Sequence, residues 1–123
     1  MNLSKLIFSG IFGAALGIQP VEAGGTGKLP VIEVATFKLQ SGVTPEVFAP
    51  IDHLVEIEHV SKQPGFLSRE SAAGANGEWL VIVHWRSLRD ADASMATFEN
   101  APVAAGFMAK IDASTMSMKR YQK

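Results

Sequence analysis

The spacing of hydrophobic residues changes several times along the chain, and each spacing predicts a different element. Residues 31–39 are rich in β-branched side chains, which favours a strand. Apolar residues fall on both of its faces, so we expect helices to cover one face and another apolar surface to cover the other. Two more strands are predicted over residues 66–72 and 78–85, joined by a turn that ends in an Asn-Gly pair, a strong hairpin signal. Apolar and polar residues alternate over residues 114–121, which predicts a fourth strand.

Helical spacing follows the first strand. Thr44 can act as an N-cap with Pro45 at the first helical position, and apolar residues then recur every three or four positions, which predicts a helix as far as Lys62. Pro50 lacks the amide that would donate to the preceding turn. We therefore expect either a kink at Pro50 or a helix that begins near Ala49.

A second helix is predicted after the third strand. Ser87 and Asp90 have the spacing of a capping box, which places the start of the helix at this point. The helix should run to about Asn100, and Pro102 should restart a short helical piece that reaches Ile111.

The predicted order of elements is therefore βαββαβ. This is the order of the ferredoxin-like α+β fold, in which an antiparallel four-stranded sheet carries both helices on one face. The other face stays bare, and the apolar residues of the first and third strands that point to it predict that a second copy covers it. We therefore expect a homodimer that associates through its sheet faces.

The first 23 residues have a different pattern. Lys5 precedes an uncharged apolar run over residues 6–18, and Pro20 and a Val-Glu-Ala sequence follow it. Such a start is typical of a secretory signal peptide. The run covers only about 20 Å of a roughly 30 Å hydrocarbon core, so a membrane anchor is not expected. We predict a signal peptide at residues 1–23, a single domain at residues 24–123, a periplasmic or secreted location, and no membrane association after the signal is removed.

Composition narrows the chemistry. The 123 residues are 47% hydrophobic and 19% charged, which is typical of a folded domain and excludes a disordered chain. With 11 Lys and Arg against 12 Asp and Glu, the net charge is −1, so nucleic acid is not an expected partner. The chain has no cysteine, which excludes disulfides, a thiol nucleophile and a cysteine-ligated metal.

Three short segments resemble a known family. They are residues 38–42 (KLQSG) at the end of the first strand, residues 63–67 (QPGFL) leading into the second, and residues 83–87 (VHWRS) at the end of the third. Over roughly residues 29–121 the sequence resembles the antibiotic biosynthesis monooxygenase-like domains of the dimeric α+β barrel superfamily. The resemblance implies a homodimer whose sheets face one another, with a small apolar cavity between the sheet and the helices of each subunit.

Members of this superfamily differ in chemistry. They include cofactor-independent oxygenases of polycyclic aromatic compounds, haem-degrading monooxygenases, isomerases and members without an assigned activity. The haem-degrading members carry an Asn on the first strand and a Trp and a His on the second helix. Residues 31–39 contain no Asn, and residues 90–110 contain neither Trp nor His. We therefore expect no haem and no other cofactor.

His84 is the first candidate for a catalytic base. It lies beside Trp85 at the end of the apolar third strand. A neutral imidazole in an apolar cavity can take a proton from a phenolic or enolic substrate, because its pKa lies near working pH. Deprotonation would make the substrate electron-rich enough to pass one electron to molecular oxygen. The alternatives are that His84 hydrogen-bonds a neighbouring strand or lies at the dimer seam.

The first helix carries a second candidate pair. His53 and Glu56 are three residues apart, which suits an acid/base pair, and His59 follows on the same side of a helix that turns about 100° per residue. His53 and His59 are six residues apart and do not converge, so no metal site is expected. The alternative is an ordinary solvated helix face.

Two tryptophans and an arginine are candidates for binding a substrate. Trp79 and Trp85 are six positions apart on one strand and therefore share a face. They can pack in the core or form walls that stack on a planar ligand. Arg69 can anchor a substrate carboxylate or carbonyl, or it can form a surface ion pair.

These observations lead to two hypotheses of function. The first is a cofactor-independent monooxygenase that acts on small, largely apolar aromatic compounds in a buried cavity. Its candidate catalytic residues are His84, His53 and Glu56, and its candidate substrate-binding residues are Trp79, Trp85 and Arg69. The alternative is a non-catalytic homodimer that binds a small ligand or serves as a stress-associated module.

Overall fold

A computed structural model describes residues 29–123 of the chain. The predicted signal peptide, residues 1–23, and residues 24–28 lie outside the described residues. The elements in order are β1 (Val31–Leu39), α3 (Pro45–Glu58), the 3-10 turn η2 (Val60–Lys62), β2 (Phe66–Ala73), the 3-10 turn η3 (Ala75–Gly77), β3 (Glu78–Trp85), α4 (Leu88–Phe98), α5 (Ala104–Ala109) and β4 (Ile111–Gln122). No helix within residues 29–123 combines the length and the apolar character needed to cross a membrane.

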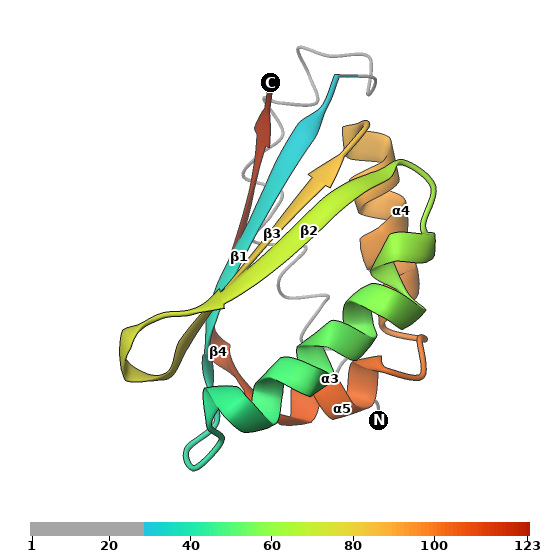
Figure 1. Cartoon of the computed structure of the whole chain (residues 1–123). Helices are drawn as coiled ribbons and strands as arrows, with labels where there is room; N and C mark the ends of the chain where they lie inside the picture. The colour runs from blue at the N-terminus through green and yellow to red at the C-terminus, as the bar shows by residue number, and fades with distance from the viewer. Residues whose placement is uncertain (1–28) are drawn as a thin grey trace.

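The sheet has the strand order β2-β3-β1-β4, and every neighbouring pair is antiparallel. The helices cover one face of it, and the other face carries none (Figure 1). The predicted βαββαβ order and the ferredoxin-like α+β fold are confirmed. The short helical piece predicted after Pro102 is α5, but it ends at Ala109, because Ile111 already belongs to β4.

Helix α3 begins where its cap predicts. The Thr44 Oγ1 accepts a hydrogen bond from the Val47 amide at 3.2 Å, and Pro45 occupies the first turn. The helix continues through Pro50, so of the two alternatives the start near Ala49 is wrong. The predicted end at Lys62 is also wrong, because α3 ends at Glu58 and η2 follows it as a separate turn.

The segments that carry the family resemblance meet in space. Gly65 has a φ of +81°, which favours glycine, and a Cβ at this position would overlap the Asp90 carboxylate. The Arg86 amide donates to the Gly65 carbonyl at 2.8 Å, and the Phe66 and Trp85 rings meet edge to face with centroids 6.1 Å apart. The Pro-Gly-Phe and Trp-Arg-Ser sequences therefore form one junction between β2, β3 and the start of α4.

The predicted Ser87 cap is confirmed at this junction, and the Asp90 carboxylate returns to the Ser87 hydroxyl. The Ser87 Oγ accepts a hydrogen bond from the Asp90 amide at 3.1 Å, and it donates to the Asp90 carboxylate at 3.0 Å. The predicted hairpin is also present, with Asn76 and Gly77 both at positive φ in the turn that joins β2 to β3.

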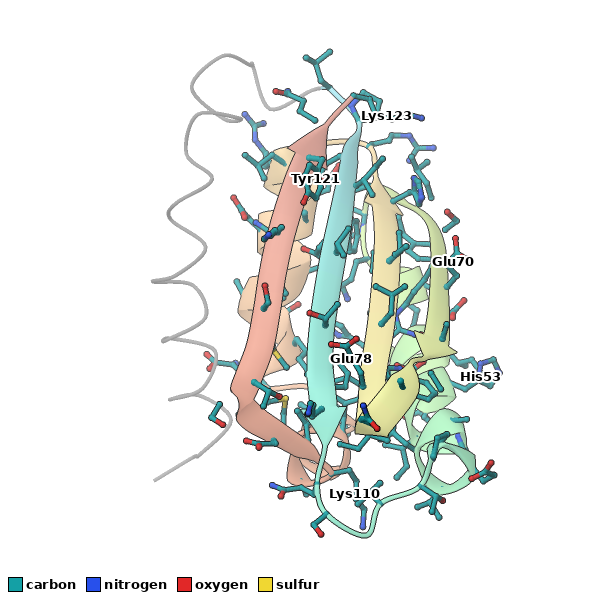
Figure 2. The ribbon with its side chains drawn as sticks, turned by 90° about the vertical axis from the view of Figure 1, so that its left-hand side faces the viewer. His53, Glu70, Glu78, Lys110, Tyr121 and Lys123 are labelled. Carbon is teal, nitrogen blue, oxygen red and sulfur yellow. The ribbon has the colours of Figure 1, made fainter. Side chains whose placement is uncertain are left out.

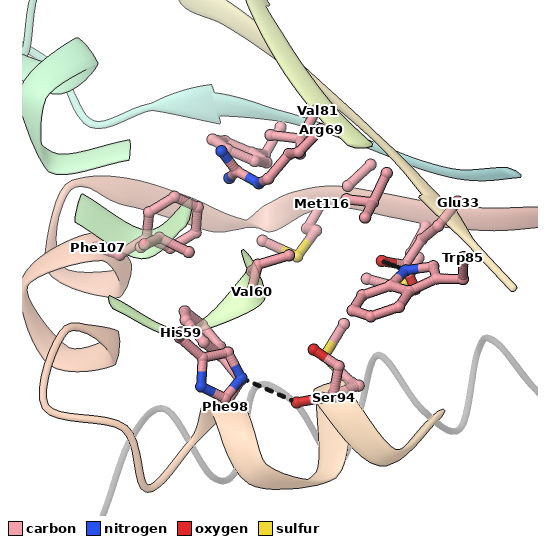
Figure 3. Close-up of a pocket in the computed structure, with 16 residues that line it drawn as sticks. Glu33, His59, Val60, Arg69, Val81, Trp85, Ser94, Phe98, Phe107 and Met116 are labelled. Atoms are coloured by element: carbon pink, nitrogen blue, oxygen red, sulfur yellow. Dashed lines mark hydrogen bonds between the residues drawn. The ribbon is translucent and has the colours of Figure 1, made fainter. Parts of the chain in front are cut away.

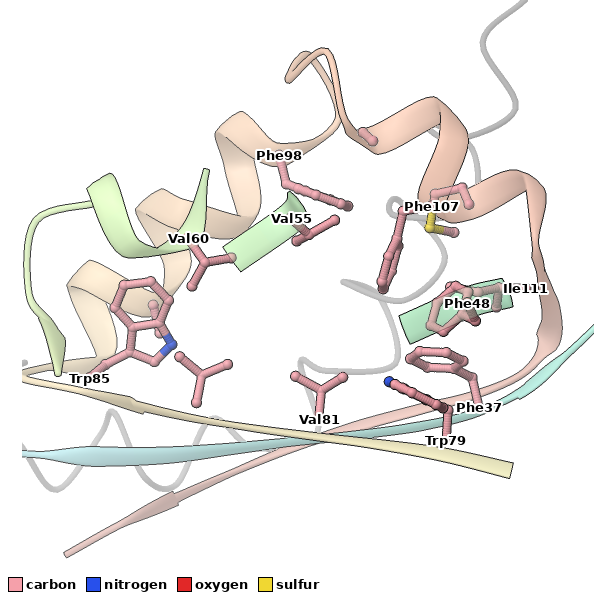
Figure 4. Packing of buried hydrophobic residues seen from close by; sticks show 14 of the residues in the cluster. Phe37, Phe48, Val55, Val60, Trp79, Val81, Trp85, Phe98, Phe107 and Ile111 are labelled. Atoms are coloured by element: carbon pink, nitrogen blue, oxygen red, sulfur yellow. The ribbon is translucent and has the colours of Figure 1, made fainter. Parts of the chain in front are cut away.

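The core lies between the sheet and the helices (Figure 4). Phe48 of α3 is its centre: its ring lies 5.0 Å from Trp79, 5.3 Å from Phe107 and 5.9 Å from Phe37, measured between centroids. The contacts of Phe48 with Trp79 and Phe37 are edge to face, and such contacts add to the stabilisation that burial of the rings provides.

Strand alternation separates the residues of the sheet into two sets. The helix-covered face takes Glu33, Phe37, Arg69, Val81, Trp85 and Arg120, and these side chains are buried. The open face takes Ile32, Val34, Leu80, Ile82, His84 and Tyr121. Figure 2 looks onto the open face, where Glu70, Glu78 and Tyr121 stand on the sheet with the helices behind it.

Candidate functional site

A cavity lies between the helix-covered face of the sheet and the helices (Figure 3). The empty space of the cavity, together with the open solvent at its mouth, is about 590 Å³, so its occupant can be no larger than a small molecule. Most of its wall is apolar and comes from all four strands, the three helices and η2. Three titratable side chains interrupt that wall: Glu33, His59 and Arg69.

Methionines form the adaptable part of the wall. Met95 of α4 and Met116 and Met118 of β4 line the cavity, and all three are only partly buried. Because the methionine side chain is unbranched and flexible, this side of the wall can adjust to different apolar shapes.

His59 is buried at the end of α3, with 6% of its surface exposed. Its Nε2 lies 3.2 Å from the Ser94 carbonyl oxygen, which can only accept, so Nε2 carries a proton. In the neutral ring Nδ1 is then the basic nitrogen, and its neighbour is the Gln63 side-chain amide at 3.5 Å. That distance is long for a hydrogen bond, so Nδ1 is only weakly engaged.

Arg69 of β2 points toward α3 and binds Asp52 with two hydrogen bonds. The Nη2 to Oδ1 distance is 2.8 Å and the Nη1 to Oδ2 distance is 3.1 Å. Ser71 donates to Asp52 at 2.6 Å, and Glu56 lies 3.7 Å from Nη1. The Nε of Arg69 is buried and has no hydrogen-bond acceptor within residues 29–123. A buried donor left unpaired costs about 1–3 kcal/mol, and more when it is charged.

Glu33 of β1 belongs to a second buried ion pair. It accepts from Arg120 of β4 at 2.8 Å and from the Trp85 indole at 3.4 Å, and Asp92 of α4 contacts the same arginine. A buried carboxylate needs such partners because desolvation penalises its charge. Arg120 therefore links Glu33 of β1 to Asp92 of α4 beside the cavity.

The structure places His84 on the open face. It pairs in register with Ile32 of β1 and Ser68 of β2, is partly buried, and does not line the cavity. Its neighbour Trp85 does line the cavity, because adjacent residues of a strand point to opposite faces. The assignment of His84 as a base stays a prediction, and it applies to the open face.

The second predicted pair is not brought together at the cavity. His53 is exposed on α3, and Glu56 is half-buried and faces Arg69. Neither lines the cavity. His59 does, because the chain leaves the helix at this residue, with φ −132° and ψ −67°, so the helical angle that grouped it with His53 does not apply.

The three predicted binding residues share the helix-covered face. Trp85 and Arg69 line the cavity. Trp79 is buried beside Phe48 and lies outside the cavity wall, where it packs in the core.

Sequence reasoning missed Glu33, and it missed Asp52 as the partner of Arg69. One signal was present: Asp52 lies between Phe48 and Val55 in the buried stripe of α3, and a carboxylate in such a stripe requires a cation. Glu33 likewise stands in the middle of an apolar strand. Among the described residues, no group of three or more His, Asp or Glu side chains could hold a metal ion.

No protein-family model and no curated protein matches the sequence. Solved structures do match, and they define the class as ferredoxin-like α+β proteins. SnoaB, a cofactor-independent oxygenase from Streptomyces nogalater, matches with a TM-score of 0.65 at 16% identity over 77% of this chain and 93% of its own. A dimeric ferredoxin-like protein of unknown function from Thermobifida fusca matches with a TM-score of 0.62 at 11% identity, over 77% and 92%.

A third match is a protein from Chloroflexus aurantiacus that is proposed to be an antibiotic biosynthesis monooxygenase. Its TM-score is 0.54 at 16% identity, over 76% of this chain and 92% of its own. At these identities the likeness shows the fold. The chain therefore has the fold of the antibiotic biosynthesis monooxygenase-like domains that its sequence resembles.

Proposed function

We propose that this protein is a cofactor-independent monooxygenase that oxidises a small, largely apolar aromatic compound in the cavity. The observation that carries the proposal is the cavity itself, an apolar space with aromatic walls and one histidine. Binding sites for small molecules have this composition, with few polar groups that orient the ligand. The fold shared with SnoaB, a cofactor-independent oxygenase, supports the same class of reaction.

The chemistry needs only a base and a water-poor space. A base removes a proton from an acidic CH₂ or phenolic group, and the resulting anion passes one electron to oxygen. Recombination gives a peroxide anion, which regains a proton and loses water. A CH₂ group and O₂ thus become a C=O group and H₂O, so all the electrons come from the substrate.

His59 is the base that we propose for this step. It is the histidine of the cavity wall, its Nε2 proton is held by the Ser94 carbonyl, and its Nδ1 has only the long 3.5 Å contact with the Gln63 side-chain amide. The earlier candidates lie elsewhere: His84 stands on the open face and His53 on the solvent side of α3.

We also propose that the open face is the interface of a homodimer. Ile32, Val34, Leu80 and Ile82 form an apolar patch at the centre of the sheet and are only partly buried in the single chain. A second copy of the same face would remove this patch from water. The dimeric ferredoxin-like protein from Thermobifida fusca supports this arrangement.

Oxygen consumption tests the reaction. With anthrone-type and quinol-type compounds, we expect His59→Gln to lower the rate about 100-fold or more, because a positioned base contributes roughly that factor. Glutamine keeps an N–H for the Ser94 carbonyl, so the fold should survive. His84→Gln and His53→Gln are the matched controls and should retain the rate.

Two other results would contradict the proposed role of His59 or the proposed reaction. A loss in His84→Gln alone would move the base to the open face. Ligand binding without oxygen consumption by the wild-type protein would support the non-catalytic binding module instead.

A further inference from the structure

We propose that three methionines of the cavity wall, the cavity methionines, form a modification site for hydrogen peroxide, and that their oxidation to sulfoxides lowers the affinity of the cavity for apolar ligands. They are Met95 of α4 and Met116 and Met118 of β4. The oxidation itself is independent of the proposed function. Its effect on binding rests on the proposed function in one respect, namely that a small apolar molecule occupies the cavity.

The cavity gathers most of the methionines that the structure describes. Residues 29–123 contain four, and three of them line the cavity. All three are partly exposed, and the cavity opens to solvent. Figure 3 shows Met116 extending from the sheet into the space between the sheet and the helices. A small solute such as hydrogen peroxide can therefore reach this wall from water.

Met108 of α5 has the same chemistry but different access. It lies in the core with 5% of its surface exposed, and it does not line the cavity. Because the packed interior leaves little room beside its sulfur, a solute reaches it only when the fold opens locally. Met108 is therefore an internal reference for the cavity methionines.

The thioether is the side-chain group of this chain that peroxide oxidises most readily. The chain has no cysteine, whose thiolate would otherwise compete for the oxidant. The sulfur attacks one oxygen of hydrogen peroxide, so an S–O bond forms and the O–O bond breaks. The departing hydroxide takes the proton of the S–OH group and becomes water. The sulfur loses two electrons and the peroxide gains them, so no further reactant is needed.

The product changes the character of the cavity wall. The methionine side chain is apolar and flexible, whereas the sulfoxide is polar and its oxygen accepts hydrogen bonds. An apolar ligand that covers this oxygen removes it from water without supplying a donor, which costs free energy. Oxidation should therefore weaken the binding of apolar ligands, and a bound ligand should shield the sulfurs from peroxide.

The rates of oxidation test the modification site in the wild-type protein. The folded protein is exposed to hydrogen peroxide for set times, and mass spectrometry of its peptides gives the sulfoxide fraction at each methionine. We expect the cavity methionines to be oxidised at least about 10-fold faster than Met108, because packing restricts access to the core. In denaturant the four rates should become equal. Equal rates in the folded protein would overturn the inference.

Naphthalene, which has no polar group, tests the effect on binding. Its Kd, measured from its own fluorescence, should rise about 10-fold after the protein is oxidised. Saturating naphthalene should slow the oxidation of the cavity methionines and leave the rate at Met108 unchanged. Circular dichroism should show that the oxidised protein stays folded. An unchanged Kd, the absence of shielding, or unfolding on oxidation would overturn the inference.

A triple variant, Met95→Leu with Met116→Leu and Met118→Leu, removes the three sulfurs and keeps apolar side chains of similar size. It should bind naphthalene like the wild type and keep that Kd after treatment with peroxide. Met108→Leu is the matched control and should lose affinity after treatment as the wild type does. An equal loss in the triple variant would overturn the inference. If the triple variant does not fold, the rates and the shielding in the wild type decide.

Failure of this inference and failure of the proposed function give different results. If the untreated protein does not bind naphthalene, the effect on binding and the proposed apolar site both fail, while the oxidation rates still decide the modification site. The proposed oxygenase activity fails separately, when naphthalene binding and the oxidation rates are as expected and no compound consumes oxygen.

Discussion

The two faces of the sheet differ in which side chains they bury, charged or apolar. On the helix-covered face, charged residues such as Glu33 and Arg69 are buried, and each is held by a partner of opposite charge. On the open face, Glu70 and Glu78 stand in solvent, and apolar residues such as Ile82 remain partly exposed. The ion pairs of the first face form within one chain, whereas the second face is the one that we propose as the dimer interface.

Replacing an aromatic residue should show the largest difference between the faces in the free energy of unfolding that is lost. Phe37→Ala removes a ring that packs on Phe48 and Phe107, and we expect the free energy of unfolding to fall by about 4 kcal/mol. Tyr121→Ala removes a ring that is 51% exposed on the open face, and at low protein concentration the loss should stay within about 0.5 kcal/mol. Denaturant unfolding measures both, and equal losses would remove the distinction between the faces.

Replacing one glutamate on each face should show a smaller difference in the free energy of unfolding. Glu33→Gln leaves Arg120 buried with only Asp92 as a charged partner and should cost about 3 kcal/mol. Glu70→Gln, on the open face, should be close to neutral. If Glu33→Gln also proved neutral in denaturant unfolding, the buried pair would not stabilise the fold.

The smallest expected change in free energy is in the association of two chains through the open face. Ile82→Lys places a charge at the centre of the open face and should raise the dimer Kd at least about 10-fold, or about 1.4 kcal/mol, while the single chain stays folded. Ala96→Lys adds the same charge on an exposed position of α4 and should leave the Kd unchanged. Sedimentation or light scattering at micromolar concentration measures this, and a monomeric wild-type protein would contradict the proposed dimer.

Local signals in the sequence predicted most element boundaries. Thr44 and Ser87 cap their helices, and Asn76 and Gly77 adopt the positive φ that their hairpin turn needs. These features depend on a few neighbouring residues, so they can be predicted from the sequence without knowledge of the fold. The end of α3 was not, because the turn η2 continues the apolar spacing after the helix has stopped at Glu58.

The candidate site was predicted less completely. Alternation along β3 already separates His84 from Trp85, so one cavity could not take both. Trp85 and Arg69, which were predicted to bind a substrate, both line the cavity, and their role in binding stays a prediction. His59 was grouped with the wrong face because the helical angle was extended one residue past the helix.

The sequence by itself determined the order of the elements, their caps and turns, and which residues of each strand share a face, because these follow from local geometry and the spacing of apolar residues. Only the tertiary structure decided which face the helices cover. That choice places Arg69 and His59, from β2 and the end of α3, on facing walls of one cavity and leaves His84 outside it. The physical reason is that packing of distant elements selects one face for burial, and local spacing carries no information about that choice.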